Sequence, residues 1–200
     1  MPIGDFSIGD IARAVWDLLT RLDIDTCFVV GHSLGGYVTL EMADQHPDRL
    51  SGFCMFHSTA YADDAPKKLN RTKVMEFVAK NGTPPFVQTL IPSLFATPKH
   101  AILESLLQEA SQISPLTVIG YARAMRDRPD RTQVYVTFPN PILFFAGMKD
   151  SIIPLESIWK QSEIAHHKVV HELAGTAHMG MLEASMEAEK VLLNFLEEAH

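Results

Sequence analysis

Apolar residues along this 200-residue chain follow two different spacings. Short, continuous apolar runs rich in β-branched and aromatic residues are typical of strands buried on both sides of a parallel sheet. Such runs lie at residues 26–31, 50–56 and 141–147, and a further strand is predicted at 168–173. Between the strands, apolar residues recur at helical spacing. The predicted helices cover residues 8–22, 35–46, 155–164 and 180–198.

The middle of the chain, residues 57–138, has a different character because it contains no convincing strand. Helices are predicted to start near Pro66, Pro98 and Pro115, where a proline suits the first helical turn. The stretch therefore indicates a helical insertion. Outside it, the alternation of strands and helices predicts an α/β fold, with a mostly parallel sheet and helices on both faces.

Composition and charge narrow the classes of function. The chain is 46% hydrophobic and carries a net charge of −7 without a dominant basic cluster, so a nucleic-acid partner is not expected. Cys27 and Cys54 lie inside apolar runs and are interpreted as reduced core residues. No run reaches the roughly 18 apolar residues of a membrane span, so no membrane partner is expected. No secretion signal opens the chain, so we expect a cytoplasmic protein if Met1 is its true start.

Three reactive residues follow predicted strands. Ser33 lies in the stretch "CFVVGHSLGG", Asp150 follows the strand at 141–147, and His178 follows the strand at 168–173. In an open parallel sheet, ligands bind beyond the carboxyl ends of the strands. A serine hydroxyl is a weak nucleophile that needs a base, and the base needs an orienting acid. Ser33, His178 and Asp150 are therefore the candidate nucleophile, base and acid.

The residues around Ser33 suit a sharp strand-to-helix turn. Gly31 and Gly35 lack the side chains that would clash in such a turn. The backbone N–H of Leu34 is the candidate oxyanion donor, since free N–H groups face outward at the start of a helix. His32 is interpreted as a residue that shapes the turn and not as a second base. No metal or organic cofactor is required for this chemistry.

With these motifs in place, the chain resembles the α/β-hydrolase family. Residues 31–35 match its G-x-S-x-G motif, residues 147–150 its G-x-x-D acid loop, and residues 175–178 its histidine loop, in the family's order. The resemblance implies an α/β-hydrolase core at residues 1–60 and 132–200 and a helical cap at 61–131. Some relatives place the acid after the second strand, so Asp63 and Asp64 are rivals of Asp150.

Plainer roles compete with the catalytic ones. Ser33 could merely close a strand, Asp150 could cap the segment after it, and His178 could be a surface histidine. The pair His166 and His167 is interpreted as solvent-facing loop rather than a metal site. The run "RAMRDRPDR" is interpreted as an ion-paired connection rather than a carboxylate clamp.

The family's fold usually has four strands before the predicted helix at 8–22, including a His-Gly loop that completes the oxyanion hole. Residues 1–6 are too short to hold them. We expect the strand before Ser33 to be an exposed hydrophobic edge through which the chain could form a homo-oligomer. Three accounts stay open, with the first favoured: a truncated gene model or fragment, a protein completed by another chain, or a degenerate relative.

The resemblance and the residues together predict a serine hydrolase. Its partner would be a small-molecule carboxylic ester or lactone, cleaved through an acyl-enzyme on Ser33. Two alternatives stay open: a carbon–carbon bond hydrolase or lyase with the same triad, and a non-catalytic binding or assembly module.

Overall fold

The computed structural model describes residues 5–97 and 100–198. The chain divides into two compact units. The first, called here the helical unit, combines Met1–Ile8 with Ala62–Pro129. The second, called the sheet unit, combines Gly9–Tyr61 with Asp130–His200.

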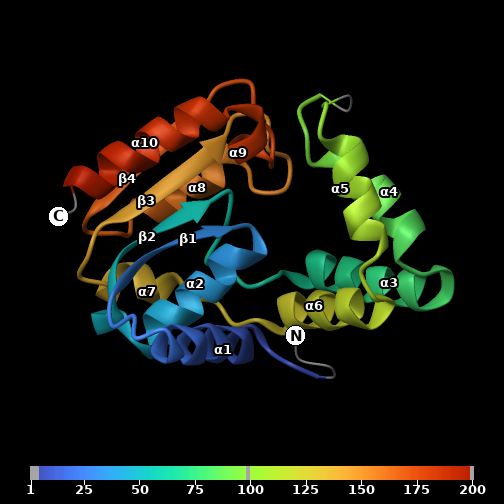
Figure 1. The fold of residues 1–200 in the computed structure, drawn as a ribbon, viewed down its shortest axis with the longest axis horizontal. Helices are drawn as coiled ribbons and strands as arrows, with labels where there is room; N and C mark the ends of the chain where they lie inside the picture. Colours follow the sequence, from blue (N-terminus) through green and yellow to red (C-terminus); the bar gives the residue numbers. More distant parts are fainter. Residues whose placement is uncertain (1–4, 98–99, 199–200) are drawn as a thin grey trace. The chain divides into compact units, whose positions relative to one another are not determined.

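In the described residues of the sheet unit, four strands form one parallel sheet in the order β1-β2-β3-β4 (Figure 1). The strands are β1 (Cys27–His32), β2 (Leu50–Phe56), β3 (Ile142–Gly147) and β4 (Lys168–Leu173). Each strand pairs with the next along the chain, so their carboxyl ends share one edge of the sheet. The predicted strand positions and the parallel fold class are confirmed.

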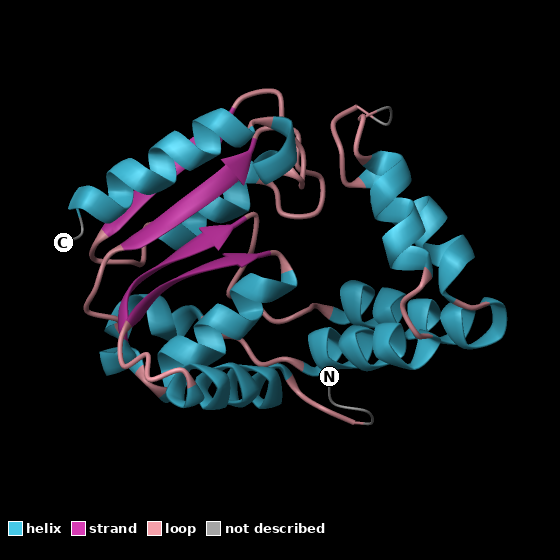
Figure 2. Cartoon of the chain, in the orientation of Figure 1, coloured by secondary structure: helices cyan, strands magenta, loops and turns pink. Residues whose placement is uncertain are grey.

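Helices cover both faces of this sheet (Figure 2). The helices of the sheet unit are α1 (Ile8–Arg21, of which Ile8 belongs to the helical unit), α2 (Leu34–Gln45), the short 3-10 helix η1 (Pro47–Arg49), α7 (Thr132–Thr137), α8 (Leu155–Ser162), α9 (Gly180–Glu183) and α10 (Ser185–Glu198). On one face, α10 packs against a cluster that includes Cys54, Leu143 and Phe195. On the other face, Tyr135 of α7 contacts Phe144 of β3. The alternating side chains of β2 and β3 therefore enter two cores.

The central and edge strands differ in burial. Every residue of β3 is buried, as the continuous apolar pattern predicts. In β1, by contrast, Val30 is 44% exposed. The prediction that this strand is buried on both sides is wrong for the described residues, because β1 is hydrogen-bonded to β2 alone. Association through this open edge stays a prediction.

The described part of the helical unit contains helices and no strand. The helices are α3 (Ala65–Asn81), α4 (Thr83–Ser93), α5 (Leu103–Ser111) and α6 (Pro115–Asp127). Helix α3 packs against α6, and α4 packs against α5. Pro66 and Pro115 lie in the first turns of their helices, as predicted, whereas Pro98 lies outside the described residues. The role of residues 61–131 as a cap stays a prediction.

The helix pattern differs from the prediction in several places. The helix predicted at 180–198 is broken at Ala184, whose φ of −137° and ψ of 47° interrupt the helical backbone between α9 and α10. Helices α4 and α7 were not predicted. The six residues of α7 are too few to show a helical period. No helix among the described residues is long and apolar enough to cross a membrane.

Candidate active site

Ser33 occupies the sharp turn between β1 and α2. Its φ of 51° and ψ of −115° place it in a backbone region that non-glycine residues rarely adopt. The N–H of Ser33 donates to the carbonyl of Phe56 at 3.0 Å, and the hydroxyl of Ser58 donates to the carbonyl of Ser33 at 2.7 Å. The end of β2 therefore fixes the backbone of the turn. Strain that the surroundings maintain in this way is typical of functional sites.

The glycines of the turn have unequal roles. A Cβ atom on Gly31 would lie 2.6 Å from the carbonyl oxygen of Gly35, and one on Gly36 would lie 2.3 Å from Oγ of Ser58. On Gly35, a Cβ would meet nothing within 4 Å in the described structure. The prediction that Gly35 relieves a clash is therefore wrong. Gly36, which the sequence argument did not single out, is the glycine that lets α2 approach the end of β2.

Leu34 is the first residue of α2. The first N–H groups of a helix have no partner within the helix, and they lie at the positive end of its dipole. The N–H of Leu34 is therefore suited to a developing negative charge next to Ser33. Its role as oxyanion donor stays a prediction.

Asp150 and His178 form a buried hydrogen-bonded pair. Nδ1 of His178 lies 2.8 Å from Oδ2 of Asp150, and both side chains are almost fully buried. The other carboxylate oxygen, Oδ1, accepts the N–H groups of Ile152 at 2.8 Å and Ile153 at 3.0 Å. Asp150 thus caps the segment after it with one oxygen and binds a histidine with the other. The interpretation of His178 as a surface residue is wrong, since it is 3% exposed.

The surroundings keep Asp150 ionised. Burial by itself raises the pKa of this carboxyl, but the hydrogen bond from His178, its positive form, and the N–H groups of Ile153 and Ile152 together lower the pKa below its ordinary value. An ionised Asp150 accepts a hydrogen bond from the Nδ1–H of His178, which leaves Nε2 as the unprotonated nitrogen of the ring. This is the tautomer that a general base requires.

A second contact joins the serine turn to the histidine loop. Nε2 of His32 donates to the backbone carbonyl of His178 at 2.8 Å. Burial lowers the pKa of His32 to about 4, so its ring is neutral near pH 7. A neutral ring held by a backbone carbonyl fits the predicted shaping role of His32. The contact brings the residue before Ser33 to the backbone of His178, while within the described residues no hydrogen bond joins the Ser33 hydroxyl to the His178 ring. Such bonds often tighten only when substrate binds.

The rival acids have other partners. Asp63 lies between two arginines, with Nη1 of Arg128 at 2.8 Å from Oδ1 and Nε of Arg71 at 3.1 Å from Oδ2. Asp64 caps α3 by accepting the N–H of Lys67 at 2.8 Å. Neither acid is paired with a histidine, so the structure favours Asp150.

The arginine-rich run at 123–131 is ion-paired, as predicted. Arg126 pairs with Asp127, and Arg128 pairs with Asp63. Arg131 donates to both oxygens of Glu41, at 2.9 and 2.8 Å. These guanidinium groups therefore have carboxylate partners inside the protein.

Two residues at the end of β2 escaped the sequence argument. Ser58 holds the serine turn, and His57 lies fully buried against the acid loop, with its Nδ1 accepting the N–H of Gly147 at 3.0 Å. Their position directly after a strand beside the nucleophile strand is the one signal that could have identified them.

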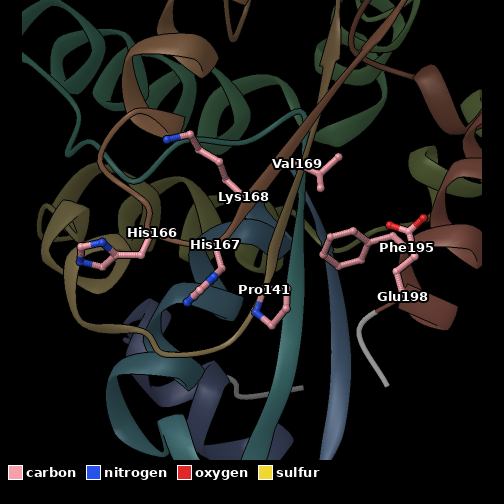
Figure 3. Close-up of a pocket in the computed structure, with 7 residues that line it drawn as sticks. All are labelled: Pro141, His166, His167, Lys168, Val169, Phe195 and Glu198. Atoms are coloured by element: carbon pink, nitrogen blue, oxygen red, sulfur yellow. The ribbon is translucent and has the colours of Figure 1, made fainter.

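Two hollows lie elsewhere in the sheet unit. One, of about 350 Å³, is at the amino ends of β3 and β4, and Figure 3 shows its lining residues, which include His166, His167 and Glu198. The two histidines are exposed, as predicted for a loop. The other, of about 410 Å³, lies beside β1 and is lined by Val30, His32 and Leu192 among others. Among the described residues, no group of three His, Cys, Asp or Glu side chains is arranged to hold a metal ion.

Known proteins resemble the chain over most of its length. It is 27% identical over 195 residues to the dihydrolipoyllysine-residue acetyltransferase component of an acetoin cleaving system from Pseudomonas putida, covering 94% of this chain and 50% of that protein. Among solved structures, a thermophilic esterase from Thermogutta terrifontis superposes with a TM-score of 0.94 at 24% identity, covering 100% of this chain and 75% of that one. An enol-lactonase from Burkholderia xenovorans superposes with a TM-score of 0.88 at 17% identity, covering 98% of this chain and 75% of that one.

At these identities, the structural likeness establishes the fold and not a shared substrate. The chain also spans half the length of the acetyltransferase component that it matches. The profile described as "Alpha/beta hydrolase family" matches residues 2–190, almost the whole chain. The protein is therefore a member of the alpha/beta hydrolase family.

Proposed function

We propose that this protein is a serine hydrolase that cleaves a small carboxylic ester or lactone through an acyl-enzyme on Ser33. Asp150 and His178 would complete the triad, and the N–H of Leu34 would be one oxyanion donor. The observation that carries the proposal is the buried 2.8 Å hydrogen bond between Asp150 and His178. The backbone of His178 also contacts His32, the residue before the strained Ser33.

The surrounding observations support the same chemistry. The candidate groups follow β1, β3 and β4, whose parallel arrangement brings their carboxyl ends to one edge. The chain belongs to a hydrolase family, and two solved structures of similar fold are named as an esterase and an enol-lactonase. These two names support an ester or a lactone as the substrate class of the proposal.

In the first half of the reaction, Oγ of Ser33 would attack the substrate carbonyl while Nε2 of His178 takes the hydroxyl proton. Asp150 would stabilise the imidazolium, and the Leu34 N–H would donate to the negative oxygen of the tetrahedral intermediate. The bond to the leaving oxygen then breaks, and His178 returns the proton to that oxygen. An ester would release its alcohol, whereas a lactone would keep it attached as a ring-opened chain.

In the second half, His178 would remove a proton from water, and the resulting hydroxide would attack the acyl carbon. Breaking the bond to Oγ of Ser33 would release the carboxylic acid, and His178 would return its proton to the serine. The nucleophile, base and acid are all side chains of this chain, so the cycle restores the enzyme with the ester or lactone and water as its reactants.

The test is covalent labelling with a fluorophosphonate probe, which phosphonylates activated serines. We expect the wild-type chain to be labelled and Ser33→Ala to stay unlabelled, with p-nitrophenyl acetate hydrolysis lost in the same variant. Equal labelling of both proteins would exclude Ser33 as the nucleophile. His166→Gln, at the opposite end of β4, is the matched control and should label like wild type.

One observation favours a second candidate, an assembly module with an inactive triad. The edge of β1 is open among the described residues, and Val30 is 44% exposed there; such edges pair readily with another strand. A second copy of the chain would then be the partner. Size-exclusion chromatography with the esterase assay separates the candidates, because an inactive oligomer supports assembly and an active monomer supports hydrolysis.

A further inference from the structure

His57 adopts the same unusual backbone region as the candidate nucleophile. Among the described residues, the non-glycine positions with positive φ are Asp23, Ser33 and His57. Ser33 and His57 each directly follow one of two neighbouring strands, since β1 ends at His32 and β2 ends at Phe56. The two strand ends, His32 and Phe56, are register partners. A bulky residue held at φ 48° is strained, and such strain concentrates at functional sites.

The His57 ring is attached to the acid loop. Its Nδ1 accepts the N–H of Gly147 at 3.0 Å, and its backbone N–H donates to Phe145 at 3.1 Å. The N–H of Asp150 in turn donates to the carbonyl of Gly147 at 3.1 Å. Gly147 is therefore held on one side by the imidazole and on the other by the triad acid. Through Gly147, the His57 ring fixes where the acid loop begins.

The same ring touches the histidine loop. A Cβ atom on Gly147 would lie 2.8 Å from Cε1 of His57, and one on Gly180 would lie 2.4 Å from its Nε2. The imidazole thus packs on bare backbone at Gly147, the last residue of β3 before the acid loop, and at Gly180, the first residue of α9 after the histidine loop. These two loops carry the two members of the hydrogen-bonded pair.

The protonation of His57 matters because two imidazoles face one carboxylate oxygen. Nδ1 of His57 lies 3.5 Å from Oδ2 of Asp150, against 2.8 Å for Nδ1 of His178. Since Nδ1 of His57 accepts a hydrogen bond from Gly147, the proton of the neutral ring lies on Nε2. A neutral His57 therefore has no donor to offer Asp150.

The electrostatic surroundings keep His57 in this form. Burial lowers its pKa to about 3, and the charges of His178 and His32 act in the same direction, against the opposing effect of Asp150. Its Nε2 is buried and has no hydrogen-bond partner in the described structure. An apolar ring would fill this space without an unpaired N–H. Retaining a histidine here is reasonable if its other nitrogen, the acceptor for Gly147, is needed.

We propose that His57 is a positioning residue: its neutral imidazole holds the acid loop through the Gly147 N–H, so that the Asp150 carboxylate is presented to His178 alone. This inference rests on the proposed hydrolase function for its kinetic consequences, but its geometric part concerns only the Asp150–His178 pair.

The experiment compares three substitutions in the full 200-residue chain. His57→Phe keeps a ring of similar shape and removes the acceptor. His57→Asn loses the ring but can accept the Gly147 N–H with its amide oxygen, and asparagine tolerates positive φ. His57→Leu also lacks an acceptor for the Gly147 N–H and serves as the second variant if His57→Phe does not fold. Folding is checked by the denaturant midpoint before any kinetic comparison.

With p-nitrophenyl acetate, we expect His57→Phe and His57→Leu to lower kcat about 10- to 100-fold with little change in KM, since loss of catalytic positioning is of this order. The variant His57→Asn should keep most of the wild-type kcat. In the variants without the acceptor, the acid limb of the kcat/KM profile should move to lower pH, because a displaced Asp150 stabilises the His178 imidazolium less well. Unchanged kinetics in His57→Phe and His57→Leu would overturn the proposal, and so would an equal loss of kcat in His57→Asn.

A second readout does not depend on turnover. The proton between Nδ1 of His178 and Asp150 should give a far-downfield ¹H NMR signal in wild type and in His57→Asn. The same signal should be weakened or lost in His57→Phe. If the wild-type chain neither labels nor hydrolyses esters, the proposed function fails, and the NMR comparison still decides the role of His57. An unchanged signal in His57→Phe would overturn the positioning role of His57 even if the enzyme is active.

Discussion

Asp63 and Asp150 are two carboxylates of nearly equal burial, 4% and 6% exposed, and each comes soon after a strand. Their partners differ. Asp63 lies within 3.1 Å of the guanidinium groups of Arg71 and Arg128, whereas Asp150 binds an imidazole and two backbone N–H groups. A guanidinium stays protonated at any working pH, while an imidazole exchanges its proton near neutrality. The first arrangement is a permanent ion pair, and the second can relay a proton.

This comparison shows that burial and position along the chain do not by themselves distinguish the two candidate acids. Both properties are shared by the two aspartates, and only the titratability of the partner separates them. Asp63 and Arg128 also lie at the two ends of the long segment of the helical unit, Ala62–Pro129. Their ion pair therefore joins the segment's beginning to its end, which is a structural task.

The largest expected effect comes from Asp150→Asn. The neutral amide lacks the negative charge with which a carboxylate stabilises the imidazolium, and it favours the wrong tautomer of His178. We therefore expect kcat to fall by about 10⁴, the order seen for this substitution in a serine protease triad. Stopped assays with p-nitrophenyl acetate would measure the loss. A variant that retains wild-type kcat would show that Asp150 is not the acid and would remove the contrast with Asp63.

Asp63→Asn should affect stability and leave kcat nearly unchanged. The substitution removes the negative charge that Oδ1 of Asp63 holds 2.8 Å from the buried guanidinium of Arg128. Because breaking a buried ion pair is strongly destabilising, we expect the free energy of unfolding to fall by about 3 kcal/mol. Urea unfolding monitored by circular dichroism measures this change. The control is Asp64→Ala, which loses only the cap of α3 and should cost about 1 kcal/mol. Loss of kcat in Asp63→Asn without loss of stability would make Asp63 the acid.

The third effect is a dependence of stability on pH that comes from two histidines near Asp150, His32 and His57. In the folded protein, the pKa of His57 is about 3 and that of His32 about 4, both below the ordinary 6.5. At a pH between the folded pKa and 6.5, each ring is protonated in the unfolded chain and neutral in the folded protein. Stability therefore falls as the pH drops from about 6.5 towards 4.

Each of these two histidines should contribute a slope that rises to about 1.4 kcal/mol per pH unit near pH 5, where the unfolded ring is protonated and the folded ring is neutral. Urea titrations at pH 7, 6 and 5 measure it. His32→Gln should remove one histidine's share, while Asp63→Asn should keep the full slope, because arginine does not titrate there. Equal stability at the three pH values would show that these rings are not held neutral.

The strands were predictable because local sequence sets their pattern. The predicted strands at 50–56 and 168–173 match β2 and β4 residue for residue. For 50–56 the reason is that a short, mostly apolar run bounded by turns has few other solutions. The same pattern failed for β1: "CFVV" resembles a buried strand, yet Val30 is exposed. A local pattern reports how apolar a strand is, and its neighbours in the sheet decide how deeply it is buried.

The sequence by itself determined the fold class, the order of Ser33, Asp150 and His178 at strand ends, and the sharp turn around the serine. These depend on periodicity and on residues near each other in the chain. Only the tertiary structure decided which carboxylate meets a histidine, which glycine is crowded, and that His57 reaches Gly147 across 90 positions. Such contacts depend on how parallel strands bring distant loops to one edge of the sheet, and no local pattern encodes that distance.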